Sequence, residues 1–206
     1  MKAAHANEAG SEHAVASTYY QFLEISVREL LIEKGVLSVE DIRNAVEEMD
    51  SRGPQLGAQV VARAWVDPQF KQSLLQDAPA AVKALGIDIG PLQLLVVENT
   101  TEVHNLIVCT LCSCYPRTLL GLPPDWYKSR EYRSRAVREP RAVLREFGTD
   151  IPDEVEVRVH DSTADLRYLV LPQRPTGTGH LTEDELSALV ERDSMIGVTV
   201  VLETGF

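Results

Sequence analysis

All three cysteines of this chain lie within six residues, Cys109-Thr110-Leu111-Cys112-Ser113-Cys114. Spacings of three and two do not place three thiols on one face of a regular element, because helix and strand faces repeat roughly every 3.6 and every 2 residues. A tight turn, by contrast, can direct all three sulfurs toward one point. The segment therefore predicts a bound metal.

Counting atoms between the sulfurs shows which donors a metal would meet. If the sulfurs of Cys112 and Cys114 bind one ion, the backbone nitrogens of Ser113 and Cys114 lie between them and close three small chelate rings. The tripeptide then supplies four donors in one plane, and Cys109 adds an axial fifth. One position stays open for water or substrate.

The chemistry of this donor set favours a catalytic ion. Three sulfurs and two deprotonated amides suit a low-spin trivalent metal, and such an ion with an open position is a Lewis acid that activates water or polarises a triple bond. Two other interpretations fit the same spacing. A structural zinc site would need a histidine such as His104 or His160 as fourth ligand, and a redox dithiol would leave the third cysteine unused.

The cysteine motif belongs to a longer pattern that one known family shares. The matching stretches are Val108–Pro116, Leu120–Lys128, Val137–Arg141, Val155–Val159, Arg167-Tyr168, Leu171-Pro172 and Arg192–Val198. They cover most of the chain from about Val15 to Thr199, and they resemble the metal-binding α subunit of nitrile hydratases.

This resemblance implies a ligand set and a reaction. Family members bind non-corrin Co(III) or non-haem Fe(III) through sulfurs and amides at the positions of Cys109, Cys112, Ser113 and Cys114, and Thr110 after the first cysteine is typical of the cobalt branch. By position Cys112 would be a sulfinic acid and Cys114 a sulfenic acid. Both are the expected catalytic residues, with the sulfenate oxygen of Cys114 as nucleophile or base. The implied product is the amide made by adding water to a nitrile.

Arg117 departs from the common pattern, which has a tryptophan at this position. Tyr115-Pro116-Arg117 resembles instead the γ subunit of thiocyanate hydrolase, whereas Leu120–Pro124 resembles nitrile hydratases. We assign Arg117 to substrate binding, because a guanidinium beside the open position favours an anionic or hydrogen-bonding substrate; a surface or interface arginine is the plainer alternative. The alternative functions are a γ-type subunit of thiocyanate hydrolase, or of a three-subunit nitrile hydratase acting on a heteroaromatic nitrile.

Arg167 and Asp161 are expected to support the site. Arg167 matches a family arginine that organises it, and Asp161 and Asp165 are close enough in sequence to pair with that arginine; structural ion pairs on adjoining strands would explain the same residues. The glutamine that many relatives place near the metal falls on Gly90 here. Gln93 replaces it only if the local register shifts.

The resemblance also implies partners. Relatives take arginines from a β-type subunit, in some cases split into two shorter chains, to hold the oxidised sulfurs. We therefore expect a hetero-oligomer that binds a small nitrile or thiocyanate, and an isolated chain that is inactive.

The composition is typical of a cytoplasmic enzyme subunit. A net charge of −11 argues against nucleic-acid binding, which requires a basic surface. The chain has no apolar run long enough for a membrane span, and its first residues, 1–14, do not resemble a secretory signal. Clustered thiols also argue against a secreted disulfide scaffold.

Periodicity predicts an α+β fold with a helical N-terminal extension and a mixed α/β layered domain, in which the cysteine turn follows a strand. Helices are expected at 19–34, from a cap at Ser38-Asp41, at 56–65, from Asp67-Pro68, at 79–85, at 139–147 and at 182–191. Strands are expected at 93–99, 105–108, 154–160, 166–171 and 196–202, with 166–171 as the partner of 154–160. The expected domains are a flexible tail (1–14), a helical region (15–90) and an α+β metal-binding catalytic domain (91–206).

Overall fold

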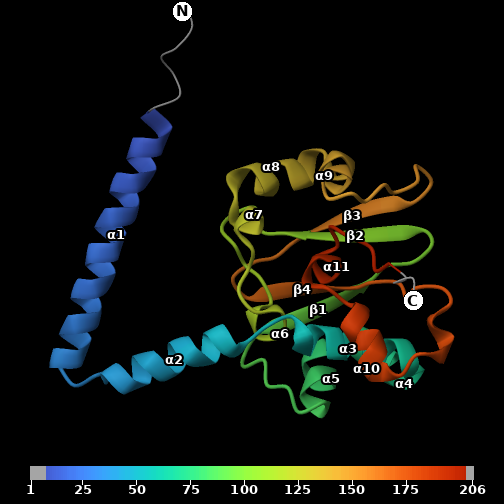
Figure 1. Ribbon diagram of the computed structural model, residues 1–206, viewed down its shortest axis with the longest axis horizontal. Helices are drawn as coiled ribbons and strands as arrows, with labels where there is room; N and C mark the ends of the chain where they lie inside the picture. Colours follow the sequence, from blue (N-terminus) through green and yellow to red (C-terminus); the bar gives the residue numbers. More distant parts are fainter. Residues whose placement is uncertain (1–7, 203–206) are drawn as a thin grey trace, which may run out of the picture. The chain divides into compact units, whose positions relative to one another are not determined.

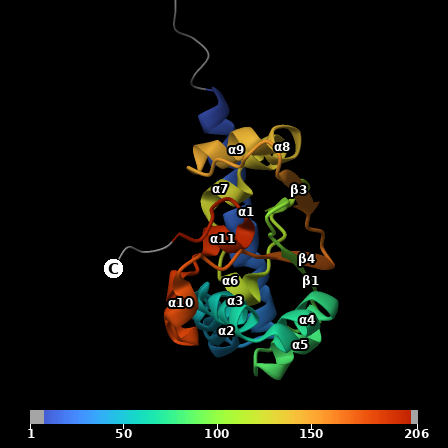
Figure 2. The same ribbon diagram turned by 90° about the vertical axis from the view of Figure 1, so that its right-hand side faces the viewer.

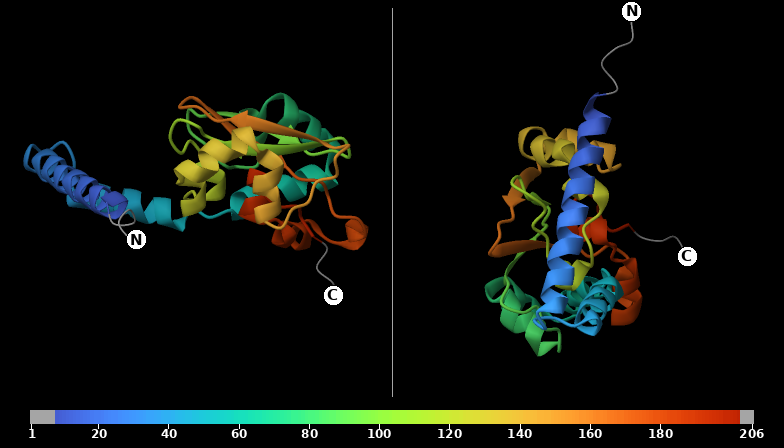
Figure 3. Two further views of the ribbon diagram at one scale, coloured as in Figure 1. Left: turned by 90° about the horizontal axis from the view of Figure 1, so that it is seen from above. Right: turned by 90° about the vertical axis from the view of Figure 1, so that its left-hand side faces the viewer.

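The computed structural model describes residues 8–202, with side chains from residue 18 onward. Its contacts divide the chain into two units, Met1–Glu48 and Met49–Phe206. The first unit is helical. Its main element, α1 (Glu8–Glu33), is one continuous helix of 26 residues (Figure 3), which corresponds to a length of about 39 Å.

Helix α2 (Val39–Ser51) begins at the cap that the sequence predicts. The Asp41 N–H donates to the Ser38 hydroxyl oxygen at 3.0 Å, and the Ser38 N–H donates to the Asp41 carboxylate at 2.9 Å. This reciprocal pair satisfies two donors at the helix start. No residue of α2 is buried, so burial contributes little to the stability of this helix.

The second unit opens with three short helices, α3 (Gln55–Val66), α4 (Pro68–Gln76) and α5 (Ala78–Ala84). Aspartates set two of the starts: Asp67 accepts from the backbone of Gln69 and Phe70, and Asp77 accepts from Ala80. An N-cap carboxylate satisfies backbone donors that the helix cannot satisfy itself. The helix start predicted at Asp67-Pro68 is confirmed, and α5 begins at Ala78, one residue before the predicted range 79–85.

Four strands form two parallel pairs. β1 (Gln93–Glu98) pairs with β4 (Leu166–Leu171), and β2 (Val103–Val108) pairs with β3 (Glu156–Asp161). The expected pairing of 166–171 with 154–160 is therefore wrong. Alternating hydrophobicity identifies a strand but not its neighbour, and here each strand finds its partner across a long stretch of chain.

The last expected strand, 196–202, is also wrong. Helix α11 (Arg192–Ile196) occupies its start, and no strand follows up to residue 202. Gly197 ends the helix with φ +91°, and a Cβ there would lie 2.0 Å from the Asn105 carbonyl oxygen. At this point the backbone passes too close to β2 for any side chain, and its left-handed conformation favours glycine. The apolar segment therefore turns at Gly197 and does not continue as a strand.

Helices cover both strand pairs. α8 (Arg130–Arg138) and α9 (Pro140–Glu146) lie beside the β2–β3 pair, and α4 and α5 lie beside β1 (Figures 1 and 2). The remaining elements are short: α6 (Arg117–Leu120), α7 (Asp125–Lys128), a 3₁₀ turn (Thr178–His180) and α10 (Glu183–Leu189). The sequence did not predict α6, α7 or α8, because none carries a long apolar period.

The arrangement is the α+β fold expected, with the cysteine turn directly after β2. Helices α3 to α5 belong to the second unit together with the strands, while the domain boundaries at residues 14 and 90 stay predictions. Of the expected tail, residues 1–7 lie outside the described residues, and 8–14 belong to α1. Among the described helices, none combines the length and the apolar character needed to cross a bilayer.

Candidate metal centre

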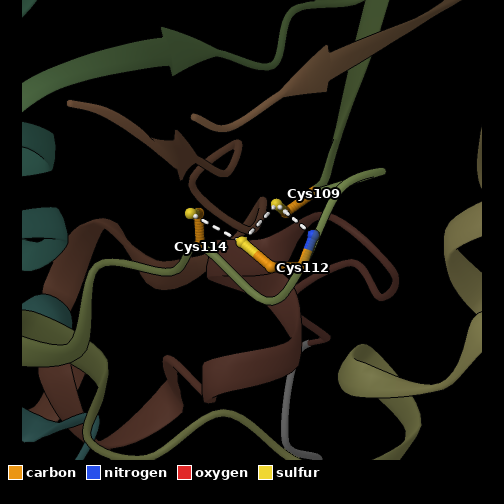
Figure 4. A group of neighbouring side chains, drawn as sticks. All are labelled: Cys109, Cys112 and Cys114. Atoms are coloured by element: carbon orange, nitrogen blue, oxygen red, sulfur yellow. Dashed lines mark hydrogen bonds between the residues drawn. The ribbon is translucent and has the colours of Figure 1, made fainter. Parts of the chain in front are cut away.

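The cysteine loop leaves the carboxyl end of β2. Val108 is the last residue of that strand and pairs with Asp161 on β3, so the loop and Asp161 emerge together at one end of the parallel pair. The turn brings the three sulfurs within 4.8 Å of one another. Cys112 lies between the other two, with Sγ–Sγ distances of 3.5 Å to Cys109 and 3.2 Å to Cys114 (Figure 4).

Backbone nitrogens of the loop lie near the same centre. The Cys112 N–H donates to the Cys109 sulfur at 3.3 Å, and the N–H groups of Ser113 and Cys114 lie close enough to the Cys112 sulfur to help lower the pKa of its thiol. Within residues 8–202, neither of these two nitrogens donates to a backbone carbonyl. The nitrogens that atom counting singled out therefore lie near the sulfurs and are not engaged in secondary structure.

Nitrogen ligands for a tetrahedral zinc site are not at hand. In the described part of the chain, no histidine or carboxylate joins the three sulfurs. His104 is buried and bonds the Gly197 carbonyl at 2.7 Å, and His160 bonds the Asn105 side chain at 2.8 Å. Both histidines thus form hydrogen bonds within the fold and do not lie beside the three sulfurs.

The sulfurs share negative charge unequally. Hydrogen bonds from the thiols of Cys114 and Cys109, reinforced by the loop N–H groups, lower the pKa of Cys112 to about 7. Burial, and its donation to Cys112, raise the pKa of Cys114 to about 12. The loop alone thus favours one thiolate, centred on Cys112. An ion bound by all three sulfurs would displace the remaining protons.

Two side chains hold the first half of the loop. Asp161 accepts from both the N–H and the hydroxyl of Thr110, at 2.9 Å and 2.6 Å. Arg133 of α8 donates to the Thr110 carbonyl at 3.3 Å. The N–H, the hydroxyl and the carbonyl of Thr110 are therefore all hydrogen-bonded. The part of the loop that these contacts do not hold is its apex.

The second half is held by an aromatic residue. Tyr127 of α7 donates its hydroxyl to the Cys114 carbonyl at 2.9 Å. No sequence pattern indicates a role for Tyr127 or Arg133. The one available signal was that Tyr127 lies in the Leu120–Lys128 stretch of the resemblance.

Arg167 lies near the sulfurs, but without its expected partners. Its charge opposes the rise in the pKa of Cys114, and its Nε atom is buried without a hydrogen-bond partner among the described residues. No ion pair within residues 18–202 joins it to Asp161 or Asp165. Asp161 supports the loop through Thr110 instead.

Arg117 begins α6, three residues after Cys114, and its side chain is exposed. In the part of the chain described, its guanidinium forms no ion pair with a carboxylate. Gln93 is the exposed first residue of β1, and Gly90 lies in the preceding turn. The assigned roles of these positions stay predictions.

The cysteine loop is a surface feature of this chain. Cys112 is exposed, and Leu111 at the apex is 88% exposed, an unusual state for a leucine. A cavity of about 380 Å³ lies elsewhere, lined by residues that include Asn99, His104 and Pro172, and it contains none of the three cysteines, Arg117, Asp161 or Arg167. A small-molecule site at the sulfurs would therefore need further walls.

Comparison with known proteins shows what the chain is similar to. The family described as "Nitrile hydratase, alpha chain" matches residues 18–199. The α subunit of a low-molecular-weight cobalt-containing nitrile hydratase from Rhodococcus rhodochrous is 54% identical over 179 residues, covering 85% of this chain and 86% of the relative. The γ subunit of thiocyanate hydrolase from Thiobacillus thioparus is 45% identical over 193 residues, covering 88% and 79%.

A solved structure extends the similarity to three dimensions. A double mutant of the Fe-type nitrile hydratase from Comamonas testosteroni Ni1 superposes with a TM-score of 0.80 at 40% identity, covering 95% of this chain and 92% of that chain. The α+β fold expected from the sequence is thereby confirmed.

Proposed function

The chain belongs to the nitrile hydratase α-chain family, and on that premise we propose that it is the metal-binding subunit of a cobalt enzyme that hydrates a nitrile to the amide. The observation that carries the proposal is the convergence of three sulfurs within 4.8 Å, next to the backbone nitrogens of Ser113 and Cys114, neither of which donates to a backbone carbonyl within residues 8–202. This donor set fits a non-corrin Co(III) ion better than zinc.

The proposed ligands are the sulfurs of Cys109, Cys112 and Cys114 and the backbone nitrogens of Ser113 and Cys114. Cobalt bound there supplies Lewis acidity toward a nitrile or a water molecule. The cobalt-containing relative at 54% identity supports this metal, and so does Thr110. Because one of the similar solved structures is an Fe-type nitrile hydratase, Fe(III) is the less favoured alternative.

Exposure of the thiols agrees with the proposed oxidation states. Cys112 is exposed, Cys114 is half-buried and Cys109 is buried. The oxidant must come from outside the chain, as dioxygen or a peroxide. Because susceptibility to oxidation follows thiolate character and access, this oxidant should take Cys112 furthest, to sulfinic acid, and Cys114 to sulfenic acid, while Cys109 should stay a thiolate. This order is the one that the family resemblance implies.

In the proposed reaction, the sulfenate oxygen of Cys114 takes a proton from a water molecule whose oxygen bonds to the nitrile carbon, and this proton is delivered to the nitrile nitrogen. If the sulfenate oxygen instead attacks the nitrile carbon itself, a water molecule must then bond to the Cys114 sulfur, break the S–O bond and restore the sulfenate, while its protons pass to the released product and to solvent. The resulting imidic acid tautomerises to the amide. Asp161, through Thr110, keeps the loop in place while the proton moves.

We propose that a β-type subunit, whole or split into two chains, completes the site in the cytoplasm. Within the described residues Leu111 and Cys112 are exposed, so a closed substrate site at the loop needs further walls. In the first unit, α1 also exposes Tyr19, Tyr20 and Phe22, each more than 60% accessible. Exposed apolar side chains grouped in this way are typical of a protein interface.

Arg117 favours one second candidate, thiocyanate hydrolysis. It is exposed directly after the loop, where a cation would attract an anionic substrate. The thiocyanate hydrolase relative is less similar than the cobalt nitrile hydratase, at 45% against 54% identity. Nitrile hydration therefore remains the better supported function, with a heteroaromatic nitrile as the substrate class that Arg117 suits.

The deciding experiment is mass spectrometry of the Cys109–Cys114 peptide from the native complex, together with its metal content. We expect cobalt and three added oxygens, two on Cys112 and one on Cys114. The same preparation is then assayed with an aliphatic nitrile, a heteroaromatic nitrile and thiocyanate. Zinc with three plain thiols would overturn the proposed metal centre, and turnover of thiocyanate alone would replace the proposed reaction.

Cysteine variants provide the control for this experiment. Cys112→Ala and Cys114→Ala should each lose both cobalt and activity, because each removes a sulfur from a shared ion. A variant that stays active and metalled would show that the loop does not bind the metal as proposed.

A further inference from the structure

Tyr127 contacts the end of the cysteine loop through both its hydroxyl and its ring. The hydroxyl donates to the Cys114 carbonyl at 2.9 Å, and the ring meets the Tyr115 ring edge-on, with 5.3 Å between centroids. Tyr127 is fully buried, and Tyr115 is 2% exposed. One buried side chain thus holds two consecutive residues at the place where the loop rejoins the fold.

The orientation of Cys114 matters because this residue is the proposed source of two ligands, its nitrogen and its sulfur. A hydrogen bond that fixes its carbonyl restricts rotation about the Cα–C bond. Tyr115 cannot compensate freely, since the residue before a proline, here Pro116, is restricted as well. With the carbonyl fixed, the nitrogen and Cβ of Cys114 keep their direction toward the other sulfurs.

Tyr127 is itself rigidly placed. Its backbone N–H donates to the Pro124 carbonyl at 3.1 Å. Its ring packs against Trp126 and Tyr132, with centroids 5.9 Å and 5.6 Å away. A support that is locked by packing can transmit precise geometry to a ligand, whereas a mobile one cannot.

We propose that Tyr127 is a positioning residue of the metal centre: its hydroxyl holds the Cys114 carbonyl and thereby sets the nitrogen and sulfur of Cys114 in the orientation that binds the metal. The inference rests on the proposed function, because it concerns the same loop. It assigns Tyr127 no contact with substrate.

Tyr132 offers a matched control. Like Tyr127, it is a buried tyrosine of the α7–α8 segment, 5% exposed, and its hydroxyl donates to a backbone carbonyl, that of Ile107, at 2.6 Å. Ile107 lies within β2, before the cysteine loop. Tyr127→Phe and Tyr132→Phe therefore remove the same chemical group from similar surroundings, and only the first removes it from the loop.

The test compares the two variants as full-length chains produced with their partner subunit. Cobalt loss to an excess of chelator is followed by metal analysis and by the sulfur-to-cobalt absorption band. We expect Tyr127→Phe to lose cobalt about fivefold faster than the unaltered protein and to shift the band, as removal of one hydrogen bond allows. Tyr132→Phe should differ by less than about twofold. Equal rates for the two variants would overturn the proposal.

A second measurement separates this inference from the proposed function. In complexes produced without cobalt, the ratio of iodoacetamide labelling at Cys114 to that at Cys112 reports the geometry of the loop. We expect this ratio to change at least about threefold in Tyr127→Phe alone, and an unchanged ratio would contradict the inference. A complex that binds cobalt and hydrates no nitrile would overturn the function, while both comparisons would still decide the role of Tyr127.

Discussion

The chemistry of this chain depends on a few residues with unusual surroundings. Cys112 has a lowered pKa and is exposed, whereas Cys109 is buried a few residues away. Thr110 between them is bonded at its N–H, its hydroxyl and its carbonyl. The loop therefore combines an accessible sulfur with a fixed backbone, which is what a metal site that must react and keep its geometry requires.

Asp161→Asn tests the contact that fixes the start of the loop. The substitution removes the charge and replaces one acceptor oxygen by a donor, so Thr110 loses part of its support. Because Asp161 is exposed, we expect a modest cost of about 1 kcal/mol in unfolding free energy, with lower cobalt content. Denaturant titration and metal analysis measure both.

Asp165→Asn serves as the control for Asp161→Asn. Asp165 is another exposed carboxylate, four residues after Asp161, and none of the hydrogen bonds or ion pairs found among the described residues involves its side chain. Asp165→Asn should leave the unfolding free energy and the cobalt content unchanged. Equal behaviour of the two variants would show that the Thr110 contact contributes nothing.

Arg117→Trp tests the proposed substrate contact. Replacing the cation by an apolar ring should raise kcat/KM for small uncharged nitriles relative to thiocyanate or a heteroaromatic nitrile, because the charge that favours polar substrates is gone. Competition assays with paired substrates measure the ratio. Arg117→Lys keeps the charge without the planar fork, and it should change the ratio less. Unchanged preference in both variants would return Arg117 to a surface role.

At the scale of elements, the parallel pairing of β2 with β3 creates the site. Val108 pairs with Asp161, and parallel strands end at the same edge, so the loop after β2 meets the carboxylate at the end of β3. Antiparallel pairing in the same register would send the two chain directions apart. Helices α7 and α8 then add Tyr127 and Arg133 from the other side of the loop.

Asp67→Ala tests how much a single cap contributes to these elements. Asp67 accepts from two backbone N–H groups at the start of α4, so its loss should cost about 1 kcal/mol of unfolding free energy. Urea denaturation followed by circular dichroism measures the change. Asp67→Asn keeps an acceptor and should stay close to the unaltered protein. If Asp67→Ala leaves the unfolding free energy unchanged, other contacts determine where this helix begins.

At the scale of the whole molecule, a buried polar network crosses the core of the second unit. Asn99 accepts from the backbone and the side chain of Asn105 and bonds His104, and Asn105 in turn bonds His160. His104 also bonds the Gly197 carbonyl. These contacts tie β2 and β3 to the segment after α11, with hydrogen-bond partners for groups that would be costly to bury alone.

This network predicts a loss of stability in acid. Burial, with a smaller repulsion from Arg141, lowers the pKa of His104 in the folded protein. The unfolded chain therefore takes up the proton first. The stabilisation from neutral His104 is complete above about pH 6.5 and is lost as the pH falls through the lowered folded-state pKa.

Thermal unfolding between about pH 7.5 and 5 measures this effect. The melting temperature should fall with pH, and His104→Gln should flatten the curve, with a remainder from His160, whose pKa is also lowered by burial. His180→Gln is the control, because His180 is exposed. A curve in His104→Gln as steep as that of the unaltered protein would exclude the histidine as its cause.

Features with local causes could be predicted from the residue order alone. The metal ligands lie within six residues, so their spacing alone restricts the donors that one ion can reach. Helix starts at Ser38, Asp67 and Thr182 were readable for the same reason, since a cap involves residues only three or four positions apart.

Contacts between distant residues became known only from the folded chain. Alternation identified four strands but paired 166–171 with the wrong one, and it read the turn at Gly197 as part of a strand. Asp161 was expected to serve Arg167 and instead bonds Thr110, and Tyr127 had no assigned role. Contacts between residues far apart in sequence depend on how the strands and helices pack together, and no local pattern encodes that packing.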